Sequence, residues 1–390
     1  MLEGRDIVCF ANDWDGDPLS KKHVMVRLAR RNRVLWVNST GNRRPRASVG
    51  DLRRSAAKIG QFARGMRQTD EGIHVYPPIF VPLFGSAAAR RLNRSLLVGG
   101  LRRARQRLGF SAPITWSFLP TSADVAGALG ERLVVYHCVD EYTEFTGTDG
   151  AAVAEMERRL LARADVVIVS SGPLLEAKRR HNPNVHLVTH GVDVEHFRRA
   201  CSPATAVPAE LAALPRPVIG FFGLIADWVD LGLLRRLALA RPEWSLVLLG
   251  KLDADPGPLA GLGNVHLFGR RPYDELPGWC KGFDVAVLPF ALNELTLAAN
   301  PLKLREYLAA GLPVVATPIP EVVRLGELVR TGRDAGEFAS RIDELLAAGR
   351  RGPDPAASRR MDGESWDEKV RQMSEIVAAA ERRAEQAVAS

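Results

Sequence analysis

The 390-residue sequence has no run of eighteen apolar residues, so it predicts no membrane-spanning helix. Its first residues lead directly into a strand-like segment without the charged and apolar parts of a signal peptide, and we expect a cytoplasmic protein. The four cysteines have no CxxC or zinc-like spacing and are expected to be reduced thiols. The sequence has no convincing Asp-x-Asp context for a metal ion either, so we expect neither a metal site nor a bound cofactor.

The chain is long enough for two domains, and its 46% hydrophobic and 25% charged residues are those of a globular protein. The net charge of +8 is unevenly distributed, because residues 1–110 contain 22 Lys and Arg against 8 Asp and Glu, whereas the remainder contains 31 against 37. A basic N-terminal part indicates an anionic partner: a membrane surface, an acidic or lipid-diphosphate ligand, or nucleic acid. Arginine enrichment through GC-rich coding is the alternative explanation.

Short apolar runs alternate with helical patterns along the chain, which is typical of doubly wound α/β domains with parallel sheets. The Pro-rich segment 198–217 is predicted to be a linker between two such domains. A second break at 350–360 precedes a predicted helix at 364–387. The expected strands are 6–11, 33–38, 72–76, 113–118, 133–137, 166–170, 185–189, 218–222, 245–249, 265–268, 285–288 and 314–316.

Residues 300–315 predict a loop, one helix and a buried strand. Pro301 suits the start of the helix and Gly311 its end. Lys303 and Glu306 are three residues apart and lie on neighbouring positions of the helix. A lysine beside a helix N-terminus can bind a diphosphate, and the carboxylate could accept hydrogen bonds from two ribose hydroxyls. The alternative is an amphipathic helix with an internal ion pair.

This segment resembles the nucleotide-sugar motif of GT-B glycosyltransferases, particularly those of glycosyltransferase family 4. Other family-like pieces follow one another in the expected order along nearly the whole chain. They are "ADVVIVSSGPLLEAKRR" (164–180), "HGVDVEHF" (190–197), "IGFFGLIADWVDLGLL" (219–234), "VHLFGRRPYDELPGWCKGFDVAVLPF" (265–290), the "ATPIPE" of 316–321, and a Ser-Trp pair at 365–366 before a helix. "AxWxD" at 226–230 resembles a subgroup that includes a teichuronic acid biosynthesis glycosyltransferase.

The resemblance implies two doubly wound, Rossmann-like parallel-sheet domains that face a cleft, the GT-B architecture. Residues 1–197 would form an N-terminal acceptor-side domain and 218–360 a C-terminal domain that binds a nucleotide sugar. Closure over the 198–217 linker would assemble the site. The last helix, within 361–390, would cross back to the N-terminal domain. The expected donor-binding residues are Gly223, Gly250, Arg270, Arg271, Phe290, Asn300, Lys303 and Glu306.

The candidate catalytic residues follow the strand expected at 133–137. Family 4 enzymes often have a histidine that touches the transferred sugar at the position that His137 matches. Asp140 matches the catalytic aspartate in the similar "YxxxD" context of the xanthan glucuronosyltransferase, and it could take the proton of the acceptor hydroxyl. The alternatives are a histidine satisfied within the protein and an aspartate that caps the next helix.

The loop after the first strand lies on the same sheet edge and would line the acceptor site. Its candidate residues are Asp13, Trp14, Asp15 and His23. A helix start with two lysines follows, and it could meet an anionic group. A solvated loop with a serine cap is the alternative.

Two positions depart from the family pattern. The family carries an arginine and a lysine shortly after the residue that Gly223 matches, but residues 224–230 contain no cation. Ala298 stands where a glutamate normally pairs with Glu306, and Glu294 is the nearest acid. Because the missing residues belong to the machinery of retaining enzymes, both retention and inversion stay open.

We therefore expect a metal-independent glycosyltransferase that moves a sugar from a nucleotide-diphosphate sugar to a hydroxyl acceptor, in cell-surface polysaccharide, glycolipid or secondary-metabolite synthesis. A nucleotide-sugar epimerase or sugar phosphorylase of the same fold is the alternative enzyme. A basic nucleic-acid-binding or scaffold protein is the alternative outside enzymes. We expect no nucleic acid partner, because residues 40–70 contain one aromatic residue, Phe62.

Two basic amphipathic helices are predicted at 51–68 and 97–108, with an apolar segment at 75–84 between them. Such helices bind anionic bilayers through charge and shallow insertion, and a lipid-linked acceptor would be found there. We therefore expect peripheral binding to the inner face of the membrane. The alternative is that both helices cover the N-terminal sheet.

Overall fold

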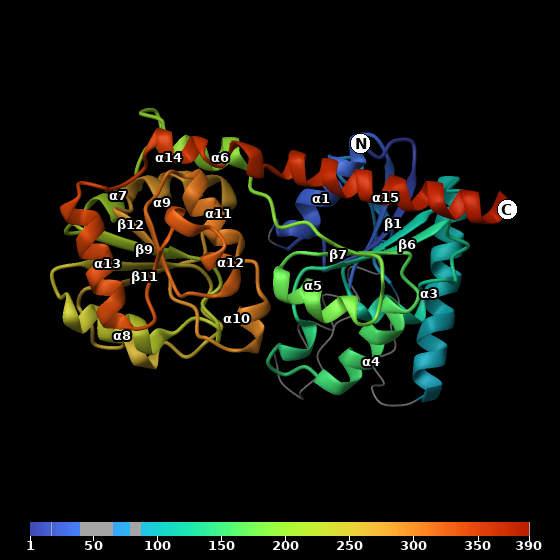
Figure 1. Ribbon diagram of the computed structural model, residues 1–390, viewed down its shortest axis with the longest axis horizontal. Helices are drawn as coiled ribbons and strands as arrows, with labels where there is room; N and C mark the ends of the chain where they lie inside the picture. Colours follow the sequence, from blue (N-terminus) through green and yellow to red (C-terminus); the bar gives the residue numbers. More distant parts are fainter. Residues whose placement is uncertain (17, 40–64, 79–86, 390) are drawn as a thin grey trace. The chain divides into compact units, whose positions relative to one another are not determined.

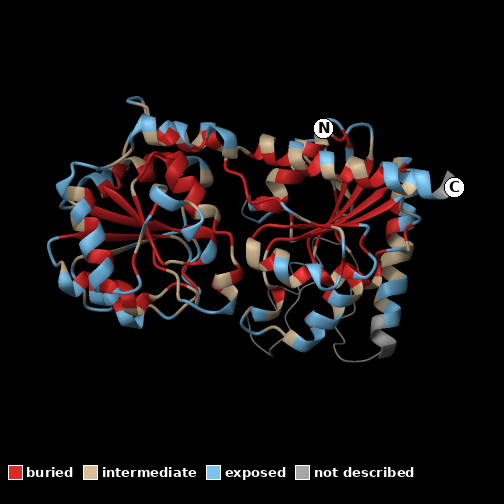
Figure 2. Ribbon diagram, viewed as in Figure 1, coloured by how far each residue is buried: buried red, intermediate tan, exposed pale blue. Residues whose placement is uncertain are grey.

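The structure is a computed structural model that describes residues 1–16, 18–39, 65–78 and 87–389. The chain forms two compact units, one made of Met1–Thr189 with Val370–Ser390 and the other of His190–Lys369. Each unit has its own sheet with helices on both faces (Figure 1). The central strands of both sheets are buried (Figure 2), as expected for parallel strands that helices cover on each side.

The sheet of the first unit has the order β3-β4-β2-β1-β5-β6-β7-β8, and all neighbours are parallel except β3 and β4. Its strands are β1 (Asp6–Phe10), β2 (Arg33–Val37), β3 (Arg67–Gln68), β4 (His74–Tyr76), β5 (Ile114–Ser117), β6 (Leu133–Cys138), β7 (Val166–Val169) and β8 (Val185–Leu187). Its helices are α1 (Ser20–Ala29), α3 (Ala87–Leu108), α4 (Gly150–Leu161) and α5 (Gly172–Arg179), with 3-10 turns η1 (Pro120–Asp124) and η2 (Tyr142–Glu144). Much of helix α15 (Trp366–Ala389) also belongs to this unit.

The sheet of the second unit is parallel throughout, in the order β11-β10-β9-β12-β13-β14. Its strands are β9 (Val218–Phe222), β10 (Ser245–Leu249), β11 (Val265–Gly269), β12 (Val285–Leu288), β13 (Val314–Ala316) and β14 (Arg330–Thr331). Its helices are α6 (Val194–Arg198), α7 (Ala209–Ala212), α8 (Leu231–Ala240), α9 (Leu276–Gly282), α10 (Glu294–Ala298), α11 (Leu302–Ala309), α12 (Pro320–Val323), α13 (Ala335–Ala347) and α14 (Pro355–Arg359). Figure 1 shows α6, α9, α11 and α14 on one face of this sheet and α8 and α13 on the other.

The strand order reverses once in each sheet. In the first unit the chain moves outward from β1 to β2 and β4, then returns to β5 on the other side of β1. In the second unit it moves from β9 to β10 and β11, then returns to β12 on the other side of β9. Loops that leave neighbouring strands in opposite directions open a crevice beyond their carboxyl ends, where ligands of such sheets bind.

The expected fold of two parallel-sheet α/β domains is confirmed, and the strands over 218–222, 245–249, 285–288 and 314–316 have the expected bounds. The N-terminal segment of the first unit ends at Thr189, so the segment 198–217 lies inside the second unit. Most of the helix expected at 51–68 lies outside the described residues. Its last two positions, Arg67 and Gln68, form β3 instead of helix because they pair with β4.

Candidate functional site

The carboxyl end of β9 begins the candidate site of the second unit. Gly223 follows this strand with a φ of +148°, and Gly250 follows β10 with a φ of +155°. A Cβ on Gly250 would lie 1.7 Å from the carbonyl oxygen of Gly223. Both positions therefore need glycine, because other residues rarely adopt this φ and the two backbones touch. The result is a surface of bare backbone at the reversal of the strand order, which a phosphate can approach closely.

Helix α11 begins beside this bare backbone. A Cβ on Gly223 would lie 3.1 Å from Cε of Lys303, so the aliphatic chain of this lysine packs against the glycine. Pro301 is the N-cap residue of α11 and provides no side-chain hydrogen bond to the helix. The first N–H groups of the helix therefore need another acceptor, such as water or a ligand. The half-buried Lys303 adds its positive charge to the positive end of the helix dipole.

Glu306 lies one turn further along α11 and is 8% exposed. Its Oε2 atom is buried and has no hydrogen-bond partner among the residues that the structure describes. Burial raises the pKa of this carboxyl above its ordinary value of 4.5, and the charge of Lys303 opposes the shift. A buried carboxylate oxygen without a donor is unfavourable, so a hydroxyl group of a ligand would be stabilising there.

Asn300 precedes α11 and is held in a buried hydrogen-bond network. Its side-chain oxygen accepts a hydrogen bond from the fully buried Arg305, and its amide donates to Glu321 at 3.3 Å. Its carbonyl oxygen is hydrogen-bonded to Nδ1 of His190 at 3.0 Å. Arg305 also forms an ion pair of 3.3 Å with Glu364. Asn300 thus fixes the loop that leads into α11, and its direct contact with a donor stays a prediction.

The loop after β11 carries the two arginines expected at the nucleotide. Arg271 forms a 2.6 Å ion pair with Glu210, and its guanidinium lies over the ring of Trp279, 5.3 Å from the centroid. Arg270 is exposed. Phe290 follows β12, is half-buried and packs against the core of the second unit. Arg271 thus has an ion-pair partner within the second unit. Phe290 follows β12, which lies on the opposite side of β9 from β10.

The structure shows the surroundings of the two positions that depart from the family pattern. Ile225 donates its N–H to the carbonyl of Lys251 at 2.9 Å, which ties the cation-free loop to the loop after β10. Asp230 caps α8 by accepting a hydrogen bond from the N–H of Leu233 at 2.7 Å. In the neighbouring helix α10, Ala298 is buried and Glu294 is exposed in the first turn. Lys303 is the cation that contacts the glycine of this site.

In the first unit, Asp140 lies in the loop after β6. Its carboxyl is half-buried, and burial raises its pKa to about 6, while Lys21 lowers this pKa and Glu141 raises it. The following turn, η2, has Glu141 as its N-cap residue and no side-chain cap bond. Asp140 therefore does not cap this turn. A pKa near 6 leaves the group ionised at neutral pH and suits it to accept a proton.

His137 is fully buried within β6, which continues to Cys138. Its ring lies 4.8 Å from that of Phe118 and 6.2 Å from that of Trp116, measured between centroids. The side chain thus belongs to the aromatic packing of the sheet. Its contact with a sugar stays a prediction.

Lys21 is the residue of this region whose role the sequence does not reveal. It is 6% exposed, and its ammonium donates a 2.6 Å hydrogen bond to the side chain of Asn12. The same ammonium lies over the ring of Tyr142, 5.4 Å from the centroid. Burial lowers its pKa to about 8, and the charge of Asp140 opposes this shift. Two consecutive lysines at a helix start were the available signal, but sequence alone does not show which of them is buried.

A second buried lysine contacts the same loop. Lys178 of α5 forms ion pairs of 2.8 Å with both Glu141 and Glu157. The hydroxyl of Tyr136 donates a 2.6 Å hydrogen bond to Glu157. This network joins α5, α4 and β6 and holds the residue next to Asp140 in place.

The acceptor-side residues occupy different environments in the first unit. Trp14 is buried, and its backbone N–H donates to the side-chain oxygen of Asn38 at 3.1 Å. The ammonium of Lys22 lies over its ring, 4.4 Å from the centroid. Asp15 forms a 2.5 Å ion pair with Arg67, in which both side chains are exposed. Asp13 and His23 are half-buried. Helix α1 receives no side-chain cap hydrogen bond, so the serine cap of the alternative interpretation is not formed.

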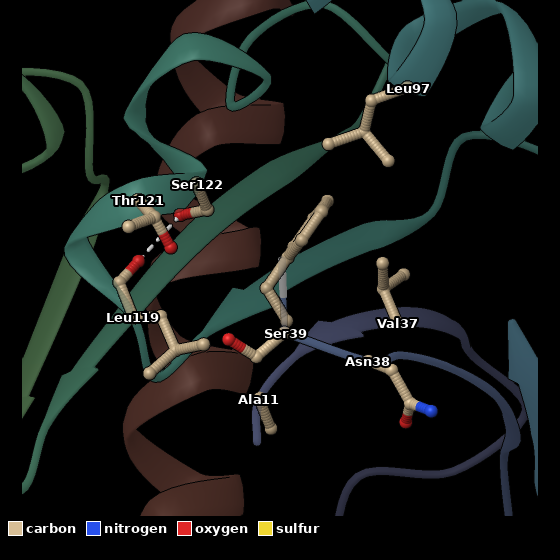
Figure 3. Close-up of a pocket in the computed structure, with 9 residues that line it drawn as sticks. Ala11, Val37, Asn38, Ser39, Leu97, Leu119, Thr121 and Ser122 are labelled. Atoms are coloured by element: carbon tan, nitrogen blue, oxygen red, sulfur yellow. Dashed lines mark hydrogen bonds between the residues drawn. The ribbon is translucent and has the colours of Figure 1, made fainter. Parts of the chain in front are cut away.

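A small pocket lies beyond the carboxyl ends of β1 and β2 and beside η1 (Figure 3). It is at the reversal of the strand order in the first unit, which is the expected ligand position of such a sheet. Its lining combines apolar groups with hydroxyl and amide groups and includes no ionisable side chain. The lining residues are Phe10, Ala11, Val37, Asn38, Ser39, Leu97, Leu119, Thr121 and Ser122.

Within the described ranges, no cluster of three or more His, Cys, Asp or Glu side chains could hold a metal ion. No helix in those ranges is both long enough and apolar enough to cross a bilayer.

Comparisons with known proteins show a similarity to glycosyltransferases. Residues 216–348 match the family model described as "Glycosyl transferases group 1". A 212-residue stretch, 49% of the chain, is 29% identical to a protein of Bacillus subtilis whose name assigns it to teichuronic acid biosynthesis as a glycosyltransferase. That match covers 52% of the curated relative, so it spans about half of its length.

Solved structures share the fold over the whole chain. The sucrose-phosphate synthase of Thermosynechococcus elongatus is 17% identical with a TM-score of 0.65, covering 99% of this chain and 100% of that one. Alr3699/HepE of Anabaena, solved with UDP-glucose, is 15% identical with a TM-score of 0.60, covering 98% of this chain and 99% of that one. At these identities the likeness establishes the two-domain GT-B fold.

Proposed function

We propose, from the group 1 glycosyltransferase domain that residues 216–348 form, that the protein transfers a sugar from a nucleoside-diphosphate sugar to a hydroxyl acceptor. The observation that carries the proposal is the pairing of Glu306 with Lys303 at the start of α11. Glu306 offers a buried carboxylate oxygen without a hydrogen-bond partner among the described residues. Lys303 places a cation against the bare backbone of Gly223. A ribose diphosphate presents hydroxyl groups and phosphate charge, the two kinds of group that these residues would bind.

The donor would bind through complementary groups. Glu306 accepts hydrogen bonds from the ribose hydroxyls, and Lys303 with the first N–H groups of α11 binds the diphosphate. Gly223 and Gly250 admit the phosphates close to the backbone, while Phe290 and the loop of Arg270 and Arg271 border the base. In this assignment protein groups neutralise the diphosphate, so the reaction needs neither a metal ion nor a cofactor besides the nucleotide sugar.

Asp140 is the proposed proton acceptor. The acceptor oxygen bonds to the anomeric carbon of the sugar, and the bond between that carbon and the diphosphate oxygen breaks. The hydroxyl proton passes to the Asp140 carboxylate, and the nucleoside diphosphate leaves with its charge stabilised at Lys303. Burial supports this role because it raises the pKa of Asp140 to about 6, closer to neutral pH than its ordinary value of 3.8.

The neutral pocket at β1 and β2 is the proposed position of the uncharged end of the acceptor. Helix α3 supports a cytoplasmic protein that binds an anionic membrane carrying a lipid-linked acceptor. Among the described residues its arginines have no salt-bridge partner, and no acidic residue occurs in this helix. The exposed members are Arg91, Arg94, Arg102, Arg103 and Arg107.

A thermal-shift screen with UDP, GDP, ADP and dTDP, each with and without EDTA, tests the donor assignment. A ligand present at a hundred times its Kd adds about 2.7 kcal/mol to the free energy of unfolding. We expect one of the diphosphates to raise the Tm, and the shift to persist in EDTA. No shift with any of them would contradict the proposed donor site, and a shift lost in EDTA would contradict its metal independence.

A further inference from the structure

The loop after β6 brings three carboxylates together with two buried lysines. Asp140 and Glu141 lie in the loop and Glu157 on α4, while Lys21 comes from α1 and Lys178 from α5. The two lysines are 6% and 4% exposed. When all five groups are ionised, the cluster carries one more negative than positive charge. Two of the carboxylates must therefore share one lysine, and the contacts show which two.

Lys178 is committed to the glutamates. Its ammonium contacts Glu141 and Glu157 at 2.8 Å each, and their charges hold its pKa above the ordinary value despite burial. The remaining oxygen of Glu157 accepts from the hydroxyl of Tyr136 at 2.6 Å. The charges of Lys178 and the two glutamates are thus matched within this group, and Tyr136 supplies a further hydrogen bond to Glu157.

Lys21 is held differently, by neutral groups. Its ammonium donates to Asn12 and lies over the ring of Tyr142, two residues after Asp140. The other titratable groups that face it are the buried thiols of Cys9 and Cys138, and burial raises the pKa of both. Asp140 is therefore the carboxylate that faces this ammonium.

We propose that Lys21 is a positioning residue whose buried charge keeps Asp140 ionised as a proton acceptor at neutral pH. The inference rests on the proposed role of Asp140 in transfer. Burial favours the protonated carboxyl, Glu141 favours it further, and the ammonium of Lys21 opposes both. Asn12 and Tyr142 hold the ammonium in place without neutralising its charge. The charge therefore remains available to stabilise the ionised form of Asp140.

The carboxyl titration of Asp140 tests this role without any substrate. In protein labelled with ¹³C at the aspartate carboxyls, the Asp140 signal is identified by its loss in Asp140→Asn. We expect a midpoint near pH 6 in the wild type. In Lys21→Met it should rise by about one to three units, the usual effect of a neighbouring opposite charge. Lys22→Met, the adjacent lysine over Trp14, is the control and should leave the midpoint unchanged. An unchanged midpoint in Lys21→Met overturns the proposal.

The reciprocal titration covers the case in which Lys21→Met does not fold. In Asp140→Asn, with lysine labelled at Cε, the pKa of Lys21 should fall below its wild-type value of about 8, because the carboxylate that raises it is gone. An unaltered lysine pKa would overturn the pairing. Full transfer activity in Asp140→Asn would instead contradict the proposed function of Asp140. It would not change the result of either titration, so the two failures can be distinguished.

Discussion

Replacing Glu306 with glutamine should weaken donor binding and stabilise the free protein at the same time. The carboxylate is buried, and its Oε2 atom has no hydrogen-bond partner among the described residues. Burial holds its pKa above 4.5 in the folded state, so folding favours the protonated form. The stability that this group contributes is therefore present below about pH 4.5 and is lost as the pH rises through the folded-state pKa.

Glutamine keeps the shape of the side chain without its charge, so the gain should appear at pH 8 and fade towards pH 4.5. An unsatisfied buried polar group costs about 1–3 kcal/mol, and losing the attraction of Lys303 offsets part of the gain. A net gain of about 1 kcal/mol corresponds to roughly 2–4 °C in Tm for a domain of this size. Loss of a charge-assisted hydrogen bond to ribose should raise the Kd of the best nucleoside diphosphate by about 5- to 30-fold.

Calorimetric scans at pH 8 and pH 5, with isothermal titration of the same diphosphate, measure both effects. Glu294→Gln is the matched control, because it removes the same charge from an exposed position on α10. It should change neither the Tm nor the Kd. A lower Tm for Glu306→Gln at pH 8, or an unchanged Kd, would refute the reasoning that connects the buried carboxylate with the ribose.

Further expectations concern the first unit. Asp140→Asn should slow transfer by about 100- to 10,000-fold while donor affinity stays unchanged, and near-normal turnover would remove Asp140 as the base. Glu144→Gln, an exposed change in the same loop, should leave the rate unaltered. The protein should float with anionic vesicles at low salt, and substitution of Arg91, Arg103 and Arg107 by serine should weaken binding by about 3 kcal/mol. Flotation unaffected by these substitutions would exclude α3 as the membrane-binding surface. The control for flotation is the substitution by serine of Arg330, Arg350 and Arg351, which removes the same number of charges from exposed positions in the second unit.

The fold could be predicted because parallel strands covered on both faces have a distinctive pattern. β9 and β10 contain no polar residue other than Ser245, every residue in them is buried, and their bounds agree with the sequence prediction. The two-residue strands β3 and β14 could not be found this way. They owe their existence to pairing with a neighbouring strand, and two residues carry no periodicity.

The candidate site could be predicted where local sequence determines geometry. Pro301 and Gly311 bound α11, and the spacing from Lys303 to Glu306 places both on one helix. The partners of Asn300, Arg271 and Lys21 could not be predicted, because they lie on other elements of the chain and meet these residues only in the folded protein. Burial also depends on the packing of whole elements, so a half-buried aspartate with a pKa near 6 is invisible in a single sequence.

The central claim is that Lys303 binds the diphosphate of the donor in the second unit, and the Kd of Lys303→Ala for the best nucleoside diphosphate tests it most directly. Loss of one charge-assisted phosphate contact costs about 1.5–3 kcal/mol, which raises the Kd by about 10- to 150-fold. Arg330→Ala removes a cation from the exposed edge strand β14 of the same unit and is the matched control. The account predicts a large increase for Lys303→Ala and none for Arg330→Ala, with the fold of both intact. Equal affinity of the wild type and Lys303→Ala would contradict it.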